Sequence, residues 1–249
     1  MDKNTLLLVF SEWIGVFAIA MITGLSPAIQ KIKPLQFLFP RREASVTFSL
    51  NAALFVFSII VYKYFFTAVS DLTVVNPTAA IQRVILDVIG LTVMAAALVY
   101  RKQPIRSALW GKEGLRSSFT FGLLLTALTL FLRSKITAIT NGINQEEGLA
   151  LLELFVIALC EVTIFFGYSQ PRFSSRFGPT VGWLISSGLF ILWQVIPIAL
   201  HGGNWQTSLY PIGLAVGQGL ILGFITSKSK HVLGPAMYVA LSQWLFLIQ

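Results

Sequence analysis

The sequence is poor in the residue types from which most soluble domains and metal sites are built. Only 11% of its 249 residues are charged, whereas a typical soluble domain has about 25%. It contains one cysteine, Cys160, and two histidines, His201 and His231. A single cysteine excludes a disulfide framework and a cysteine-based metal cluster, and two distant histidines do not form a typical zinc site. We therefore expect no metal and no cofactor.

The chain is instead rich in apolar residues. Hydrophobic residues make up 55% of the chain and the mean hydropathy is +0.77. A soluble core cannot bury this much apolar surface, so the composition predicts an all-α polytopic membrane protein. About eight segments are long enough to cross a bilayer, which takes about 20 residues each. The expected spans are residues 5–28, 46–69, 79–100, 115–133, 149–170, 179–200, 208–226 and 231–248.

The net charge of +8 is concentrated in every second connection between these segments. Cytoplasmic loops are enriched in Lys and Arg, so this side is predicted to be cytoplasmic and both termini to face away from it. An inner, plasma or thylakoid-type membrane fits, and nucleic-acid binding is not expected. The basic residues on this side are Lys31, Lys33, Arg41, Arg42, Arg101, Lys102, Arg106, Lys112, Arg116, Arg172, Arg176, Lys228 and Lys230; Lys3, Arg83, Arg133 and Lys135 fall on the other.

The chain is divided provisionally into N-terminal transmembrane helices with a basic segment, residues 1–113, and a helical core, residues 114–249. The basic stretch 101–118 is either a short amphipathic element along the headgroups or a plain solvated loop. Asn144 is a predicted N-cap, with Glu146 and Glu147 in the first helical turn, where the helix dipole favours negative charge. The alternative, a catalytic Glu pair, is less favoured because the residue four positions after the second Glu is Leu151 and not an arginine. Small residues that allow close helix packing recur at Gly213, Gly217, Gly219 and Gly223. They favour tight packing within the bundle over the alternative of a dimer interface.

Ionisable residues at membrane depth are costly and usually have a partner. Arg83 and Asp87 are four residues apart on one helix face, which predicts an ion pair. Glu12 and Lys63 lie toward the same end of their spans, so they could pair with each other, or Lys63 could extend outward to the membrane surface. Glu161 has no basic neighbour within a helical turn, so it is either a hydrogen-bonded structural carboxyl or a functional one.

Three segments in the second half form an ordered set of motifs. The first runs from Glu161 through Phe165-Phe166-Gly167 to Phe177-Gly178, the second is Phe190–Gln194, and the third is Tyr238–Ser242 after Gly234-Pro235. Together they resemble the CAAX protease and bacteriocin-processing family of intramembrane proteases over about residues 150–247. The family pattern is Glu-Glu-x-x-x-Arg, then Phe-x-x-x-His, then His-x-x-x-Asn.

The resemblance implies a helical bundle in which a Glu and a His activate water and a second His with the Asn stabilises an oxyanion. Here the first Glu is Glu161. The remaining family positions hold Val162 and Phe166, then Gln194, then Tyr238 and Ser242. Gln194 cannot accept a proton, and neither it nor Tyr238 replaces imidazole as a metal ligand.

The main hypothesis is therefore a non-catalytic family member, a pseudoprotease, in which Glu161, Gln194, Tyr238 and Ser242 form a structural polar cluster. It would serve as an interaction, scaffold or assembly subunit, with other integral membrane proteins and lipids as partners. The alternative is an intramembrane endopeptidase with Glu161 as general base, acting on a prenylated or leader peptide. A weaker third hypothesis is a small-solute carrier that uses Glu12, Lys63 and Asp87.

Overall fold

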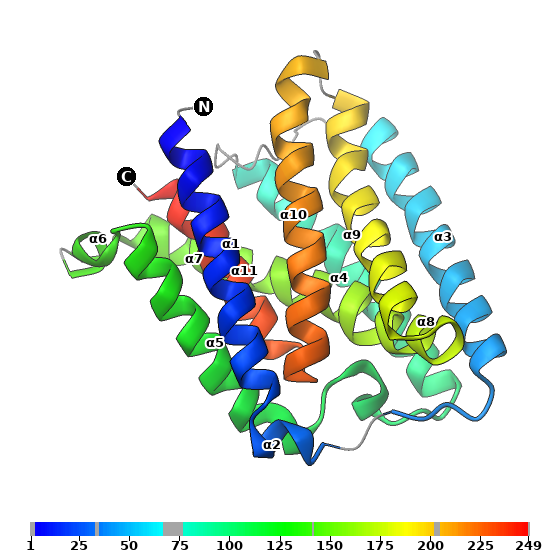
Figure 1. Ribbon diagram of the computed structural model, residues 1–249. Helices are drawn as coiled ribbons and strands as arrows, with labels where there is room; N and C mark the ends of the chain where they lie inside the picture. Colours follow the sequence, from blue (N-terminus) through cyan, green and yellow to red (C-terminus); the bar gives the residue numbers. More distant parts are fainter. Residues whose placement is uncertain (1–2, 33–34, 67–76, 141, 202–204, 249) are drawn as a thin grey trace.

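The computed structural model describes residues 3–32, 35–66, 77–140, 142–201 and 205–248. Within these ranges all regular structure is helical (Figure 1). The elements in chain order are α1 (Lys3–Gly24), α2 (Pro27–Gln30), α3 (Pro40–Tyr64), α4 (Pro77–Tyr100), the 3₁₀ turn η1 (Ile105–Ala108), α5 (Lys112–Leu132), α6 (Ile136–Thr140), α7 (Gln145–Glu161), the π-helix η2 (Val162–Ser169), α8 (Gln170–Phe177), α9 (Pro179–His201), α10 (Trp205–Ser229) and α11 (Leu233–Leu247).

The predicted fold class, an all-α polytopic membrane protein, is confirmed. In the described part of the chain, seven helical segments are long and apolar enough to cross a membrane. The eighth expected span, residues 231–248, is the 15-residue helix α11. At about 1.5 Å per residue, α11 is shorter than the apolar core of a bilayer, which is about 30 Å thick. It lies inside the bundle, where most of its side chains are buried.

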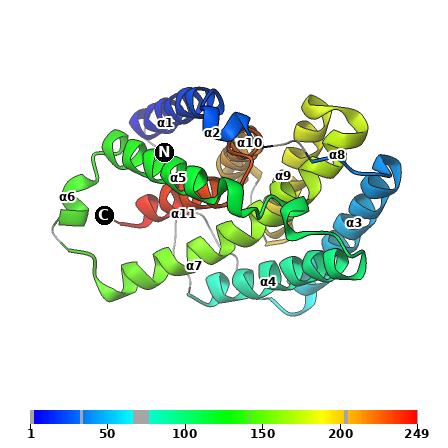
Figure 2. The same ribbon diagram turned by 90° about the horizontal axis from the view of Figure 1, so that it is seen from below.

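The N-terminal helices do not pack mainly on one another. Helix α1 lies against α5 and α10, α3 lies against α8 and α9, and α4 runs along α7. Viewed from below, α11 lies between α5 and α7 (Figure 2). The first helices thus surround the C-terminal ones, and the division of the chain at residue 113 stays a prediction.

The connections follow local signals in the sequence. The Asn144 side chain accepts a hydrogen bond from the Glu147 N–H, and the Glu147 carboxylate accepts one from the Asn144 N–H, which confirms the predicted N-cap of α7. The stretch 101–118 is not one amphipathic helix. It contains the turn η1, a left-handed residue at Leu109 (φ 58°), and then the start of α5. Trp110 ties this connection to the bundle by donating to the Thr163 hydroxyl at 3.2 Å.

Three of the four glycines of α10 allow close packing within the bundle. A side chain at Gly217 would meet the Trp13 ring, one at Gly223 would meet Trp183, and one at Gly219 would meet Phe190. Gly213 faces open space. The predicted role of small residues in close helix packing therefore holds at Gly217, Gly219 and Gly223.

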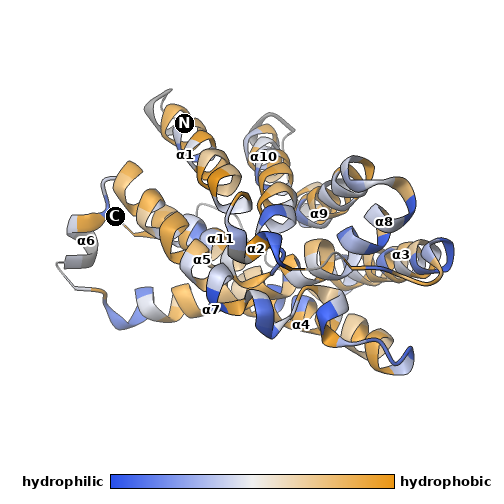
Figure 3. Cartoon of the chain, turned by 60° about the horizontal axis from the view of Figure 1, so that its bottom comes forward, coloured by the Kyte–Doolittle hydropathy of each residue, from blue (hydrophilic) through white to orange (hydrophobic). Residues whose placement is uncertain are grey.

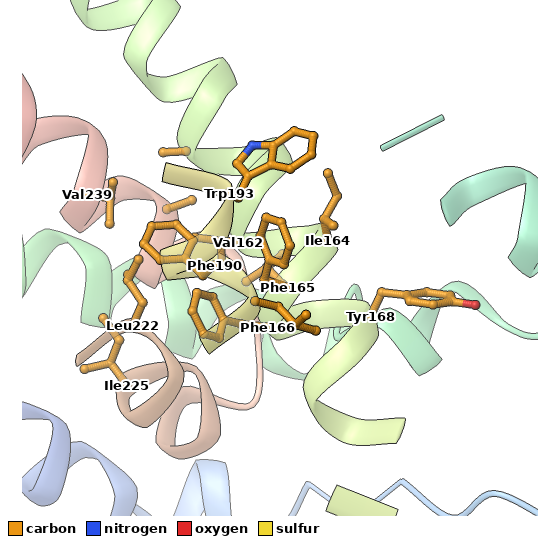
Figure 4. Close-up of a cluster of buried hydrophobic side chains, with 14 of the residues drawn as sticks. Val162, Ile164, Phe165, Phe166, Tyr168, Phe190, Trp193, Leu222, Ile225 and Val239 are labelled. Atoms are coloured by element: carbon orange, nitrogen blue, oxygen red, sulfur yellow. The ribbon is translucent and has the colours of Figure 1, made fainter. Parts of the chain in front are cut away.

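The π-helix η2 continues α7 directly after Glu161 and forms the centre of the core. All eight of its residues are buried, and Figure 4 shows the rings of Phe165, Phe166, Phe190 and Trp193 gathered around it. π-Helices are rare and occur mostly as short insertions at functional sites. This one changes the helix register between Glu161 and the exit of the segment at α8.

Hydropathy differs between the helix faces and one end of the bundle. Apolar residues dominate the long helices, whereas hydrophilic residues gather around α2, α8 and the start of α3 (Figure 3). The basic connections predicted to be cytoplasmic, including those of Arg41, Arg101 and Lys230, lie at this lower end in Figure 1. The beginning of α1 and the end of α11 lie toward the opposite end.

Candidate functional site

Glu161 is enclosed by partners from two other helices. Its side chain is 1% exposed. One carboxylate oxygen accepts hydrogen bonds from the Arg83 guanidinium of α4, with a distance of 3.1 Å to Nε, and the two side chains form an ion pair. The other oxygen accepts from Nε2 of Gln194 on α9 at 2.8 Å. The partner of Glu161 is thus an arginine 78 positions away in the sequence.

Arg83 connects this carboxylate to a second one. Its Nε lies 3.2 Å from Oδ2 of Asp87, as the four-residue spacing predicts. Oδ1 of Asp87 accepts from the Trp193 indole at 2.9 Å, and Arg83 also donates to Oε1 of Gln194 at 2.8 Å. We call Arg83, Asp87, Glu161, Trp193 and Gln194 the Glu161 network. It joins α4, α7 and α9, and it contains two carboxylates but one guanidinium.

The other two positions of the first motif are apolar and add nothing to this network. Val162 and Phe166 are fully buried in the core around η2 (Figure 4). A charge introduced at either position would be buried and would need a partner. This chain thus has neither the second carboxylate nor the arginine of the family motif, and both positions lie in an apolar environment.

Tyr238 and Ser242 belong to a different group. The Ser242 hydroxyl donates to Glu12 at 2.8 Å, and Arg133 lies against both, with Nε 2.7 Å from Glu12 and Nη2 2.8 Å from the Ser242 hydroxyl. Tyr238, one turn before Ser242, lines a small cavity with Ser242 and Arg133. We call Glu12, Arg133, Tyr238 and Ser242 the Glu12 network.

The suggested pairing of Glu12 with Lys63 is wrong. Glu12 is completely buried and its cation is Arg133 from the end of α5. The Lys63 ammonium lies 5.4 Å from the Tyr64 ring at the exposed end of α3. A buried carboxylate needs a cation within contact distance, and Arg133 occupies that place.

A third charged group lies at the basic end of the bundle. Glu43 at the start of α3 accepts from Arg101 and from Gln103 at 2.9 Å. Arg172 of α8 is completely buried, with Nε 3.4 Å from Glu43 and Nη1 2.7 Å from the Tyr168 carbonyl. This group fastens α3 to α8 and to the connection after α4.

The structure thus brings together Glu161 and Gln194, and separately Tyr238 and Ser242. Sequence reasoning missed Arg83 as the partner of Glu161, Arg133 as the partner of Glu12, and the role of Arg172. A usable signal existed in the first two cases, since each intramembrane carboxylate requires a cation. The identity of each cation could not be predicted, because it lies far from its carboxylate in the sequence. The side chain of His201 lies outside the described part of the chain.

The comparison with protein families is positive for the second half of the chain. Residues 146–245 match the family model described as type II CAAX prenyl endopeptidase Rce1-like. Residues 146–245 belong to the CAAX protease family. No curated protein and no solved structure matches the chain. The CAAX protease segment runs from the first turn of α7 nearly to the end of α11 and contains Glu161, Gln194, Tyr238 and Ser242.

Each network therefore joins positions of the CAAX protease motifs to residues outside the matched segment. Arg83 and Asp87 come from α4, Glu12 from α1 and Arg133 from the end of α5. Within the described residues, no group of three or more His, Cys, Asp and Glu side chains is placed to hold a metal ion. As built, the Glu161 network can neutralise charge and join helices. Its carboxylate oxygens are already occupied by protein donors.

Proposed function

We propose that this chain is a non-catalytic member of the CAAX protease family that acts as an interaction, scaffold or assembly subunit of a membrane protein complex. The observation that carries the proposal is the enclosure of Glu161. A general base must lie within hydrogen-bond reach of the water it activates. Both oxygens of Glu161 accept from Arg83 or Gln194 instead, and the residue is only 1% exposed.

The other motif positions support the same proposal. The Gln194 amide donates to Glu161 and accepts from Arg83, so both of its ends serve the network. Tyr238 and Ser242 lie with Glu12 and Arg133 rather than with Glu161. Donors that stabilise an oxyanion must converge on the atom where charge develops, close to the base and the attacked bond.

We infer that the partners are other integral membrane proteins and lipids, which meet the apolar outer faces of the helices (Figure 3). The positive-inside bias supports an orientation in which both termini lie on the non-cytoplasmic side of an inner, plasma or thylakoid-type membrane. The carrier hypothesis is not supported by the geometry, because Glu12, Asp87 and Lys63 have separate environments.

The test compares wild type with Glu161→Gln after mild-detergent purification from native membranes. Both proteins are incubated with a prenylated peptide, and co-purifying membrane proteins are identified by mass spectrometry. Glu153→Gln on the same helix is the matched control. A stoichiometric partner retained by both variants, with no peptide cleavage by any form, is the expected result.

The alternative, an endopeptidase with Glu161 as general base, predicts a different outcome. Wild type and Glu153→Gln would cleave the peptide, whereas Glu161→Gln would lose turnover and accumulate an uncleaved precursor in cells. That pattern would overturn the non-catalytic proposal.

A further inference from the structure

A cavity of about 290 Å³ opens at the basic end of the bundle. Its lining comes from Ile32 and Leu35 near α2, from the turn η1, the start of α5, helix α8 and the end of α10. In Figure 1 these elements meet at the lower edge, where the spanning helices end. Lipid headgroups lie at this depth in a bilayer. The cavity contains no residue of the Glu161 network, so an inference about it does not rest on the proposed function.

The rim of the cavity carries positive charge. Arg106 and Lys230 both line it, and Arg106 lies 3.3 Å from Glu113, an ion pair that is largely exposed. The Lys230 ammonium donates to the carbonyls of Ile29 and Ile32 at 3.3 and 2.8 Å, which fixes its position. An ammonium has three N–H donors, so one remains to face a ligand.

The start of α5 adds backbone donors to this rim. Gly111 is the N-cap of α5, and Gly111 and Gly114 line the cavity. The Gly114 N–H already donates to the Gly111 carbonyl at 3.2 Å, so the donors for a ligand are the first two amides of the helix. Gly111 has no side chain with which to accept from the first amides of the helix. The N-terminus of a helix attracts anions because these amides point outward and the helix dipole is positive there.

Two buried polar side chains of the lining have unused hydrogen-bonding atoms. Gln170 is 5% exposed and Thr226 is completely buried. Nε2 of Gln170 donates to the Gly223 carbonyl at 3.0 Å, but Oε1 of Gln170 and the Thr226 hydroxyl have no partner within the described structure. Leaving such buried groups without a hydrogen-bond partner is unfavourable. The amide oxygen needs a donor, so it calls for a hydroxyl or amine rather than for another anion.

Apart from Ser174, Ser175 and Ser227, the remaining lining is apolar. Ile32, Leu35, Leu109 and Pro179 contribute to it, and the Ile105 side chain beside Arg106 is 67% exposed on the outside of η1. The ligand must therefore combine an anionic group, a hydrogen-bond donor and an apolar part at headgroup depth.

We propose that this cavity binds the headgroup of an anionic, hydroxyl-bearing phospholipid. Arg106, Lys230 and the first amides of α5 receive the phosphate, and Gln170 and Thr226 receive the headgroup hydroxyls. Glu113 competes with the phosphate for Arg106. A soluble phosphate ester offers the same polar chemistry without the acyl chains, and the experiment separates the two.

The experiment measures lipid binding to the full-length protein in detergent by native mass spectrometry, with phosphatidylglycerol, phosphatidylcholine and glycerol 3-phosphate as probes. We expect phosphatidylglycerol to bind at least tenfold more tightly than phosphatidylcholine. Arg106→Gln should weaken phosphatidylglycerol binding about tenfold, as the loss of a charge-assisted hydrogen bond does. Glu113→Gln should strengthen it about threefold, because it removes a carboxylate that competes with the phosphate for Arg106.

Thr226→Val tests the buried end of the site. It removes a hydroxyl with no protein partner and keeps the shape of the side chain, so thermal stability without lipid should not fall. Phosphatidylglycerol binding should weaken about fivefold through one lost hydrogen bond. Ser186→Ala is the matched control, since the Ser186 hydroxyl is also buried without a partner and does not line this cavity.

Equal affinity for the two lipids, or unchanged phosphatidylglycerol binding in both Arg106→Gln and Thr226→Val, would overturn the proposal. Glycerol 3-phosphate that displaces the lipid at equal concentration would show a site for soluble phosphate esters, and the lipid assignment would then be wrong.

Discussion

The Arg83 guanidinium lies between the carboxylates of Asp87 and Glu161, so one cation of α4 balances two buried anions. All three side chains are nearly or completely buried. Removing the cation leaves two unpaired carboxylates, whereas converting Glu161 to its amide leaves a one-to-one pair of Arg83 and Asp87. The two substitutions are therefore expected to differ in cost.

Arg83→Gln should lower the free energy of unfolding by about 3–5 kcal/mol, the usual cost of a buried charge that loses its partner. Glu161→Gln should cost less, about 1–3 kcal/mol, because the amide oxygen still accepts from Arg83 while its NH2 group loses the bond from Nε2 of Gln194. Unfolding in mild detergent measures both. Lys63→Gln, at an exposed lysine, serves as the control and should change little. An equal loss of unfolding free energy in the two buried variants would show that the stability of the network does not depend on charge balance by Arg83.

The Glu12 network should behave as one coupled unit. Glu12 and Arg133 contact each other and share Ser242 as a partner. In a cycle of Glu12→Gln, Arg133→Gln and the double variant, we expect a coupling of about 1–3 kcal/mol, as for other contacting buried pairs. Additive losses would mean that the ion pair contributes nothing beyond its separate side chains.

His231 gives the fold a specific dependence on pH. Its ring is buried in the connection before α11, and this burial lowers the pKa of His231 to about 4 from its usual value of 6.5. Nδ1 accepts from the Leu233 backbone at 3.0 Å, which requires the neutral ring. The unfolded chain takes up this proton at higher pH than the folded one. Stability is therefore full above about pH 6.5 and falls as the pH drops toward about 4.

Stability measured in detergent from pH 7.5 to 4 checks this expectation. His231→Asn removes the titrating ring, and its side-chain oxygen can still accept from the backbone two residues on, as in an Asx turn. The variant should be less sensitive to acid over this range. If its acid profile matches that of wild type, another group is responsible for the sensitivity.

Topology can be tested with single cysteines, because the native Cys160 is buried. In a Cys160→Ser background, Lys112→Cys lies at the exposed start of α5 and Glu146→Cys at the exposed start of α7. The positive-inside rule predicts that an impermeant maleimide labels the second from the outside of sealed cells and the first only after lysis. The reverse pattern would invert the proposed orientation.

The sequence was most informative where the signal was local or depended on composition. Long apolar runs predicted the helices, the Asn144 cap predicted the start of α7, and the four-residue spacing predicted the Arg83–Asp87 pair. Motif order predicted the family, which the match over residues 146–245 supports. Each of these predictions depends on residues that are close together in the chain or on the overall composition.

The rest depended on contacts between distant helices. Nothing near Glu161 in the sequence points to Arg83, and nothing near Glu12 points to Arg133 rather than Lys63. Tyr238 and Ser242 share one face of α11, as their spacing requires, but that face meets α1 and the end of α5 in the structure. The packing of helices decides which polar residues converge, and no local pattern records it.

The π-helix after Glu161 also makes the length of this segment a determinant of function and fold. A π-helix takes more residues per turn than an α-helix, so η2 accommodates its eight residues in fewer turns. Deleting one residue there would let the segment close as an ordinary α-helix. It would then change the orientation of α8, with its buried Arg172, relative to Glu161. A single deletion in this apolar stretch should therefore be more damaging than most substitutions within it.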